Sequence, residues 1–203
     1  MRPVPPSAVP AVGYPYVVNG LPHADDARAW ADRAADVPAT WFARESWLHG
    51  VRHTQRVHIH AQRLVSELNW PEHDARVALR AALWHDIGRV NDGWDPRHGA
   101  LSAKRVADRG LDAAFSKADS RIARFAIRDH SRSDRHGELR ATDEADHERA
   151  LRVLWLLKDA DALDRVRLAP PGQGAYEIDS TTLRLTCTIE MIEFAEELLA
   201  ALS

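Results

Sequence analysis

Proline, the residue least compatible with helices, is concentrated at one end of this chain. Six of the 11 prolines lie within residues 1–22. Because proline fixes φ and lacks a backbone N–H donor, this stretch is expected to form an extended arm. The remaining sequence is rich in Ala, Leu, Arg and Glu, which favour helices. We therefore expect an all-α fold, in which a Pro-rich N-terminal arm (1–22) precedes one compact helical bundle (23–203).

Apolar residues after the arm recur at intervals of three and four, which is the spacing of one face of a helix. The expected helices are 24–35, 45–67, one opened by Trp70-Pro71 and ended by Gly88, 98–109, one around 122–130, 148–163 and 188–202. A loop is expected at Pro170-Pro171-Gly172. The Thr-rich run 181–188 is a candidate for a short strand.

Composition excludes several classes of protein. The single cysteine, Cys187, excludes an intramolecular disulfide framework and a cysteine-cluster zinc site. The net charge of −3 argues against stable nucleic-acid binding, which usually needs a basic surface. No apolar run approaches the length of about 18 residues that a membrane span requires. A cytoplasmic protein is the expectation, and the arm could embrace a second copy in a homo-oligomer.

Histidines and aspartates stand at the inner ends of the predicted apolar stripes. Examples are Asp86, His130 and Asp161, each aligned with apolar residues of its own helix. Burial of an imidazole or a carboxylate is costly unless the group is paired or binds a metal. Four helices that share this pattern favour a common metal site. Histidine and aspartate without cysteine suit Mn, Fe, Co, Ni or Mg.

The order of these residues resembles a known family. His85-Asp86, within Leu83-Trp84-His85-Asp86-Ile87-Gly88, resembles the doublet of the HD superfamily of metal-dependent phosphohydrolases. The segment 48–53 supplies the upstream histidine, and the segment 158–164 supplies the downstream aspartate. This H…HD…D order is more specific than the doublet alone. The resemblance covers roughly residues 45–168 and implies a helical domain with a bound divalent metal.

The resemblance also implies which residues bind metal. His53 matches the first ligand, with His49, one turn earlier, as the competing choice. Asp161 is preferred as the downstream ligand because it lies on the inner face of its helix, whereas Asp159 is expected to be solvated. His98 and His130 match two further ligands of the dinuclear members. Two ions per chain are then held by His53, His85, Asp86, His98, His130 and Asp161, with Asp86 bridging.

Two of these histidines have a simpler interpretation. His98 could merely cap its helix, and His130 could be an ordinary core or surface residue.

The resemblance implies hydrolysis of a phosphate ester or anhydride by a metal-activated water, with a small phosphorylated molecule, most often a nucleotide, as substrate. Candidate catalytic residues are His85, Asp86 and Arg89. Candidate substrate-binding residues are Arg56, Arg132, Arg135 and Arg165, because arginine can bind phosphate bidentately. The loop 91–97 joins two ligand-bearing helices and is a candidate lid or specificity loop.

Two other functions fit the same residues. Some members of the superfamily use four histidines and two aspartates to hold two iron ions and activate dioxygen, so an oxygenase is an alternative. A catalytically silent domain that binds a nucleotide or a protein partner is another.

Overall fold

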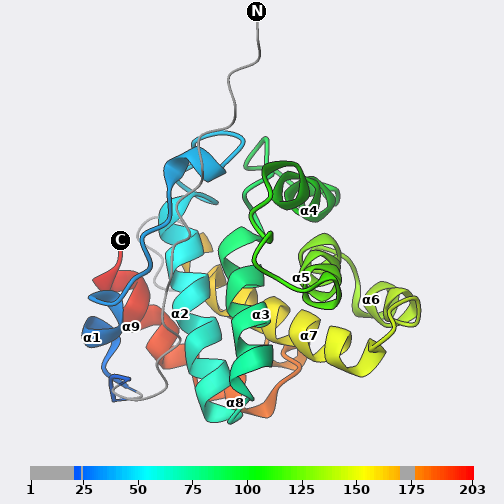
Figure 1. Cartoon of the computed structure of the whole chain (residues 1–203). Helices are drawn as coiled ribbons and strands as arrows, with labels where there is room; N and C mark the ends of the chain where they lie inside the picture. The colour runs from blue at the N-terminus through cyan, green and yellow to red at the C-terminus, as the bar shows by residue number, and fades with distance from the viewer. Residues whose placement is uncertain (1–20, 24, 170–176) are drawn as a thin grey trace, which may run out of the picture.

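The structure is a computed structural model that describes residues 21–23, 25–169 and 177–203. The described residues form helices and loops without a strand (Figure 1), which confirms the all-α prediction. The elements are α1 (Ala27–Ala31), η1 (Ala39–Trp41), α2 (Val51–Glu67), α3 (Glu72–Trp84), α4 (His98–Arg109), α5 (Lys117–Asp129), α6 (Asp134–Ala141), α7 (His147–Leu163), η2 (Asp164–Leu168), η3 (Ser180–Thr182), α8 (Thr186–Ile189) and α9 (Ile192–Ala201).

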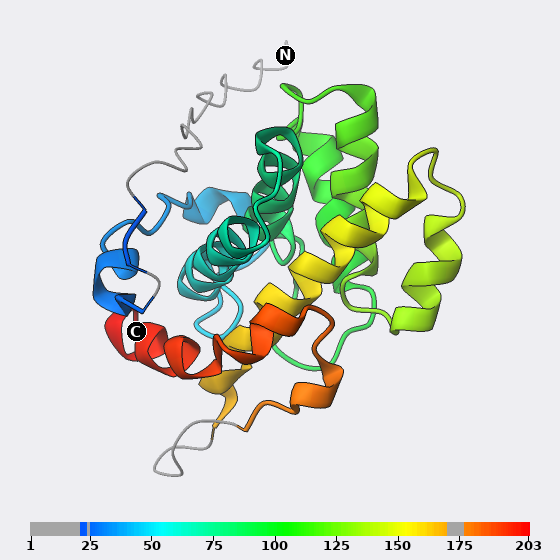
Figure 2. The same cartoon turned by 90° about the horizontal axis from the view of Figure 1, so that it is seen from below.

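Four helices, α2, α3, α5 and α7, enclose the main apolar core. Helix α4 packs chiefly on α5, and α6 packs on α7, both on one side of the bundle (Figure 1). On the opposite side, α9 lies beside α1, as two perpendicular views show (Figures 1 and 2). A smaller apolar cluster, which includes Trp30, Ile59 and Phe194, joins α1 and α9 to α2.

Several helix ends follow from local side-chain chemistry. Ser116, Ser133 and Asp146 each accept a hydrogen bond from a backbone N–H of the first turn of α5, α6 and α7, respectively. Gly110 ends α4 with a φ of 62°, in the left-handed region that suits glycine. The predicted bounds of α4 are therefore confirmed.

Other predicted bounds are wrong. Helix α2 begins at Val51 instead of Glu45, because Ser46 Oγ accepts hydrogen bonds from the N–H groups of Leu48 and His49 and so holds a turn there. The helix expected at 24–35 is limited to the five residues of α1. The expected helix 188–202 is divided into α8 and α9.

The C-terminal segment corrects a further interpretation, and one helix was missed. The strand considered at 181–188 is wrong, because this run forms η3 and the start of α8. Helix α6 was not predicted, since its sequence Asp-Arg-His-Gly-Glu-Leu-Arg-Ala offers no apolar stripe.

The predicted arm lies almost wholly outside the described residues, as does the loop at 170–172. No helix of the described chain is both long and apolar enough to cross a bilayer.

Two glycines allow α4 to lie close to its neighbours. A Cβ on Gly99 would stand 2.5 Å from the carbonyl oxygen of Ile127 in α5, and a Cβ on Gly88 would collide with the backbone of Leu101 and Ser102. Both distances are far inside van der Waals contact. Because Gly99 follows His98, this close approach also determines how near His98 lies to the end of α5.

We expect Gly99→Ala to destabilise the fold by about 1–3 kcal/mol, because the added methyl group forces α4 away from α5. The free energy of unfolding, measured by urea titration, checks this. Gly93→Ala is the matched control, since a Cβ there meets only Asn91 Oδ1 at 3.5 Å in an exposed loop. Equal stability of the two variants would contradict the prediction.

Candidate metal centre

Four histidines from four helices meet at one end of the bundle. His53 lies in the first turn of α2, and His98 is the first residue of α4. His85 and His130 directly follow the last residues of α3 and α5. All four are buried. The predicted convergence of helix ends is therefore what the structure shows.

The same ring nitrogen is engaged in all four histidines. In three of them Nδ1 donates a hydrogen bond to the carbonyl oxygen three residues earlier: His85 to Ala82 (2.8 Å), His98 to Asp95 (2.5 Å) and His130 to Ile127 (2.7 Å). His53 Nδ1 donates to Asp164 Oδ2 at 2.7 Å. These contacts place the proton on Nδ1 and leave the lone pair of Nε2 free, as in metal-binding histidines.

The free Nε2 atoms face one another in two pairs. His53 Nε2 lies 3.0 Å from His85 Nε2, and His98 Nε2 lies 3.0 Å from His130 Nε2. Neither pair can form a hydrogen bond, because the protons are on Nδ1. Two nitrogens that each bind one ion at about 2.1 Å, at a right angle, are about 3.0 Å apart. The spacing thus fits a cation for each pair.

Asp86 stands between the two pairs. Its Oδ2 lies 3.6 Å from His53 Nε2, and its Oδ1 lies 3.4 Å from His98 Nε2. Oδ1 is buried without a hydrogen-bond partner among the described residues, which is costly for a carboxylate unless a cation is bound. Each oxygen of Asp86 therefore faces one pair of histidines.

Asp161 completes one of the two groups. Its Oδ1 lies 3.4 Å from His53 Nε2 and 3.8 Å from His85 Nε2. One group therefore has two imidazoles, Asp161 and Asp86 Oδ2, and the other has two imidazoles and Asp86 Oδ1. The donor set fits divalent metal ions of intermediate hardness.

The protonation states of His85, His98 and Asp86 suit metal binding. Burial lowers the pKa of His85 to about 3, and burial together with His130 lowers that of His98 to about 4. Burial alone would raise the pKa of Asp86, but the neighbouring His85, His130 and His49 hold it well below its usual value. Neutral imidazoles and ionised carboxylates are the forms that bind metals.

His49, the competing choice for the first ligand, has a different position. Its Nδ1 lies 3.1 Å from Asp86 Oδ2 and 3.3 Å from Arg167 Nη2. The structure thus places His49 beside Asp86, where His49, His53 and Asp86 also have ligand atoms close enough to share an ion, while His53 is the histidine that pairs with His85.

Asp164 was not singled out from the sequence, yet it orients the centre. It accepts the Nδ1 proton of His53 and also binds Arg56 through Nε (2.6 Å) and Nη2 (3.2 Å). Its spacing of three residues from Asp161 places both on one helical face, and that signal could have identified it. Carboxylate–histidine pairs of this kind fix the ring of a metal ligand.

Asp159 corrects an expectation. It was expected to be solvated, but its side chain is 0% exposed. It accepts hydrogen bonds from the backbone N–H groups of Arg184 and Leu185 and from Thr188 Oγ1. Its role is to attach the segment before α8 to α7.

A cavity of about 570 Å³ opens onto the centre, and cationic side chains line it. Of the arginines predicted to bind or act on substrate, Arg89, Arg132 and Arg165 line this cavity. Arg89 Nε also lies 3.3 Å from Asp86 Oδ2. Arg167, which also follows Asp161 closely enough to be a phosphate-binding candidate, lines it too. So do Lys158 and Arg184, which the sequence did not single out as substrate-binding.

Two of the predicted substrate-binding arginines lie elsewhere. Arg56 is buried against Asp164 and donates to the carbonyl of Leu202, so it does not line this cavity. Arg135 is an exposed residue of α6, away from the cavity lining. Arg56 lies about one helical turn after His53, but its guanidinium is bound to Asp164 and does not line the cavity.

The predicted lid loop does border the cavity. Gly93, Trp94, Asp95 and Pro96 are among its lining residues, and Trp94 is 90% exposed. Asp92 attaches this loop to the segment before α2 by accepting hydrogen bonds from Arg44 Nη2 and Ser46 Oγ.

Two further histidines of α2, His58 and His60, are buried but lie apart from the centre. Burial lowers the pKa of each to about 3. Both ring nitrogens of His60 lack a hydrogen-bond partner among the described residues. An imidazole in this position is stable only when neutral.

His60 therefore makes the fold sensitive to acid. The unfolded histidine titrates near 6.5 and the folded one near 3, so the unfolded state binds more protons between these values, and stability falls as the pH falls below about 6.5. We expect His60→Phe to reduce the loss of stability between about pH 7 and about pH 5.

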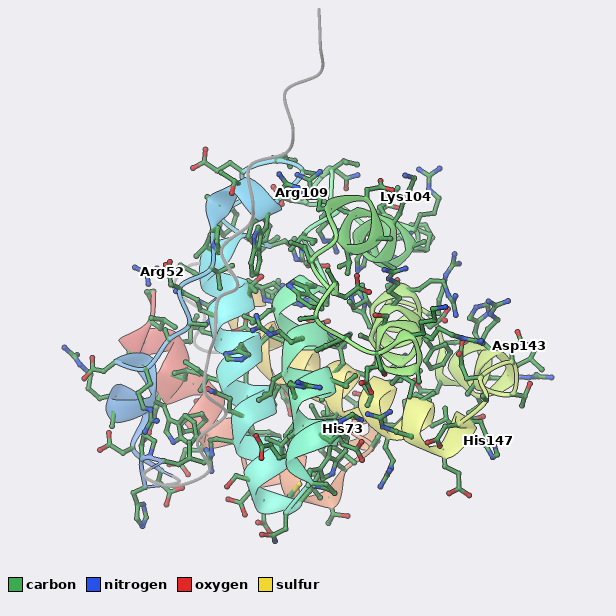
Figure 3. The ribbon with its side chains drawn as sticks, in the orientation of Figure 1. Arg52, His73, Lys104, Arg109, Asp143 and His147 are labelled. Carbon is green, nitrogen blue, oxygen red and sulfur yellow. The ribbon has the colours of Figure 1, made fainter. Side chains whose placement is uncertain are left out.

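Urea unfolding at both pH values, with a chelator present, measures this effect. His147→Phe, at an exposed residue of α7 (Figure 3), is the control and should keep the wild-type pH dependence. An unchanged pH dependence in His60→Phe would show that this side chain contributes no acid sensitivity.

Comparison with known proteins agrees with this geometry. The family model of the HD domain matches residues 50–166, more than half of the chain, and this span includes the six residues of the centre. Neither the curated proteins nor the solved structures that were searched include a match to the chain. The His/Asp cluster and the matched span lead to one conclusion: the chain belongs to the HD-domain family, whose members are generally metal-dependent phosphohydrolases.

Proposed function

We propose that this protein hydrolyses a phosphate ester or anhydride of a nucleotide, with two divalent ions per chain. The supporting observation is the pair of facing Nε2 groups on either side of Asp86, each 3.0 Å apart. One such pair would suffice for one ion, and the second pair has no other evident purpose. Manganese, iron, cobalt, nickel and magnesium are the candidate metals.

The residues that would hold the ions form two sets. His53, His85 and Asp161 with Asp86 Oδ2 form one, and His98 and His130 with Asp86 Oδ1 form the other. When bound, divalent ions supply Lewis acidity toward phosphoryl oxygens and lower the pKa of a coordinated water.

The cationic lining of the cavity supports a phosphorylated substrate. Arg132 and Arg165 are exposed in the lining, one after α5 and one in η2, and are available to bind the outer oxygens of a phosphate group. Arg89, beside Asp86, would bind nearer the reacting phosphorus atom. These side chains bind and orient the substrate, and they offset its negative charge as the bond to the leaving group breaks.

Nucleotide specificity comes from the resemblance to the family and from one residue at the rim. Trp94, almost fully exposed beside the cavity, could stack on a base. A volume of about 570 Å³ is within the usual range for small-molecule sites.

Metal analysis tests the number of ions. Protein purified without chelators should contain about two divalent ions per chain, and His98→Ala should contain about one, because it removes a ligand of only one set. Asp143→Ala, at an exposed residue between α6 and α7 (Figure 3), should retain two. One ion in the wild type would exclude a role for His98 and His130 as ligands of a second.

Turnover of a nucleotide panel tests the reaction. With Mn²⁺ and without oxygen, release of phosphate or nucleoside is expected from some of the mono-, di- and triphosphates, dinucleoside polyphosphates or cyclic nucleotides. Asp86→Ala should lose this activity entirely, because both ions depend on its carboxylate, while Asp143→Ala should retain it.

A silent panel with metal bound would contradict nucleotide hydrolysis. Oxygen consumption by the iron-loaded protein with a substrate would then support the oxygenase, which uses the same ligands.

A further inference from the structure

A second cavity, of about 800 Å³, lies next to the metal cavity. The two cavities share Leu48 and Arg167 in their linings, while none of the six residues of the metal centre lines the second one. Its walls come from η1, the segment between η1 and α2, and the first two turns of α2. Arg167 of η2, Leu199 in the last turn of α9 and Ser203 complete them. It is therefore a separate space on the other side of Leu48.

Apolar side chains form much of this second cavity. Phe42, Val51 and Leu199 line it, each partly buried. Trp47 also lines it and is 84% exposed, so most of its ring is in contact with water. An apolar or aromatic body in the cavity would cover surfaces that water now contacts.

Arginine is the main charged residue of this cavity. Arg44, Arg52, Arg56 and Arg167 line it, together with Glu45. Arg44 is paired with Asp92, and Arg56 and Arg167 are paired with Asp164, so Arg52 is the arginine of this lining without a carboxylate partner among the described residues. Arg52 extends from the first turn of α2 toward solvent (Figure 3) and donates a hydrogen bond to Gln55 Oε1. Arg56 uses three of its five N–H groups within the protein. Donors thus remain for an anion.

Two of these arginines also contact residues that lie against the metal centre, namely Asp164 and His49. Arg56 binds Asp164, which accepts the Nδ1 proton of His53. Arg167 donates to the carbonyl of Leu48 and lies 3.3 Å from His49 Nδ1. A ligand that draws either guanidinium toward itself would change how His53 is oriented, and hence the metal affinity of its set.

We propose that the second cavity binds a small amphipathic anion, an aromatic or apolar body bearing one carboxylate, sulfonate or phosphate, and that its binding alters metal affinity at the His53 set. The apolar body lies against Trp47, Phe42 and Val51, and the anionic group faces Arg52 and Arg56. Binding itself does not depend on the proposed hydrolysis, and its test needs no substrate.

The probe is 8-anilino-1-naphthalenesulfonate, an aromatic sulfonate whose fluorescence rises in apolar sites, titrated into the full-length folded protein. Saturable binding at one site is expected. Arg52→Ala should weaken it about tenfold, the loss typical of one charge-assisted hydrogen bond. Lys104→Ala, which removes an exposed cation of α4 on the far side of the bundle (Figure 3), should leave it unchanged.

A second variant separates this cavity from other apolar surfaces. Leu199→Trp should fill the cavity and abolish probe binding, with circular dichroism confirming the fold. Trp94→Phe, at the metal cavity, should bind the probe as the wild type does. The absence of saturable binding, or equal binding by the wild type, Arg52→Ala and Leu199→Trp, would overturn the proposal.

The coupling has its own measurement. Calorimetric titration of the metal-free protein with Mn²⁺ should give a different affinity for one ion when the probe is saturating, and by reciprocity Mn²⁺ should shift probe affinity by the same factor. Probe binding with an unchanged Mn²⁺ affinity would overturn the coupling, whatever the outcome of the nucleotide panel.

Discussion

The central constraint of this structure is that four imidazoles present unprotonated nitrogens to one another. The protons are fixed on the opposite ring atoms by three backbone carbonyls and one carboxylate. Such an arrangement repels itself unless positive charge lies between the rings. A bound divalent cation would therefore stabilise the close packing of α2, α3, α4 and α5 at this end of the bundle.

The sequence predicts much of this centre because its ligands stand at helix ends. His85 and His130 each follow the last turn of a helix, and His98 opens one, so the turn signals that delimit the helices also locate the ligands. What the sequence could not predict is pairing over long separations. Asp159 is covered by residues 184–188, and Arg56 turns toward Asp164, and neither partner follows from local spacing.

Positive charge around the centre is divided between two spaces. Arg89, Arg132 and Arg165 line the metal cavity, while Arg44, Arg52 and Arg56 line the second cavity. Within the metal cavity, Lys158 and Arg184 are both paired with Asp134, so their charge is offset inside the protein. The exposed arginines are therefore the groups best suited to bind an incoming anion.

The position of α4 has a consequence for how metal ions would exchange at the centre. His98 is supplied by a helix outside the four-helix core, attached chiefly through α5 and through hydrogen bonds from Arg105 to the carbonyls of Trp41 and Phe42. His53, His85 and Asp161 belong to core elements. Local opening costs least at the periphery of a fold. If two ions bind as proposed, they should therefore exchange with solution at unequal rates, the one near His98 being released first when α4 loosens.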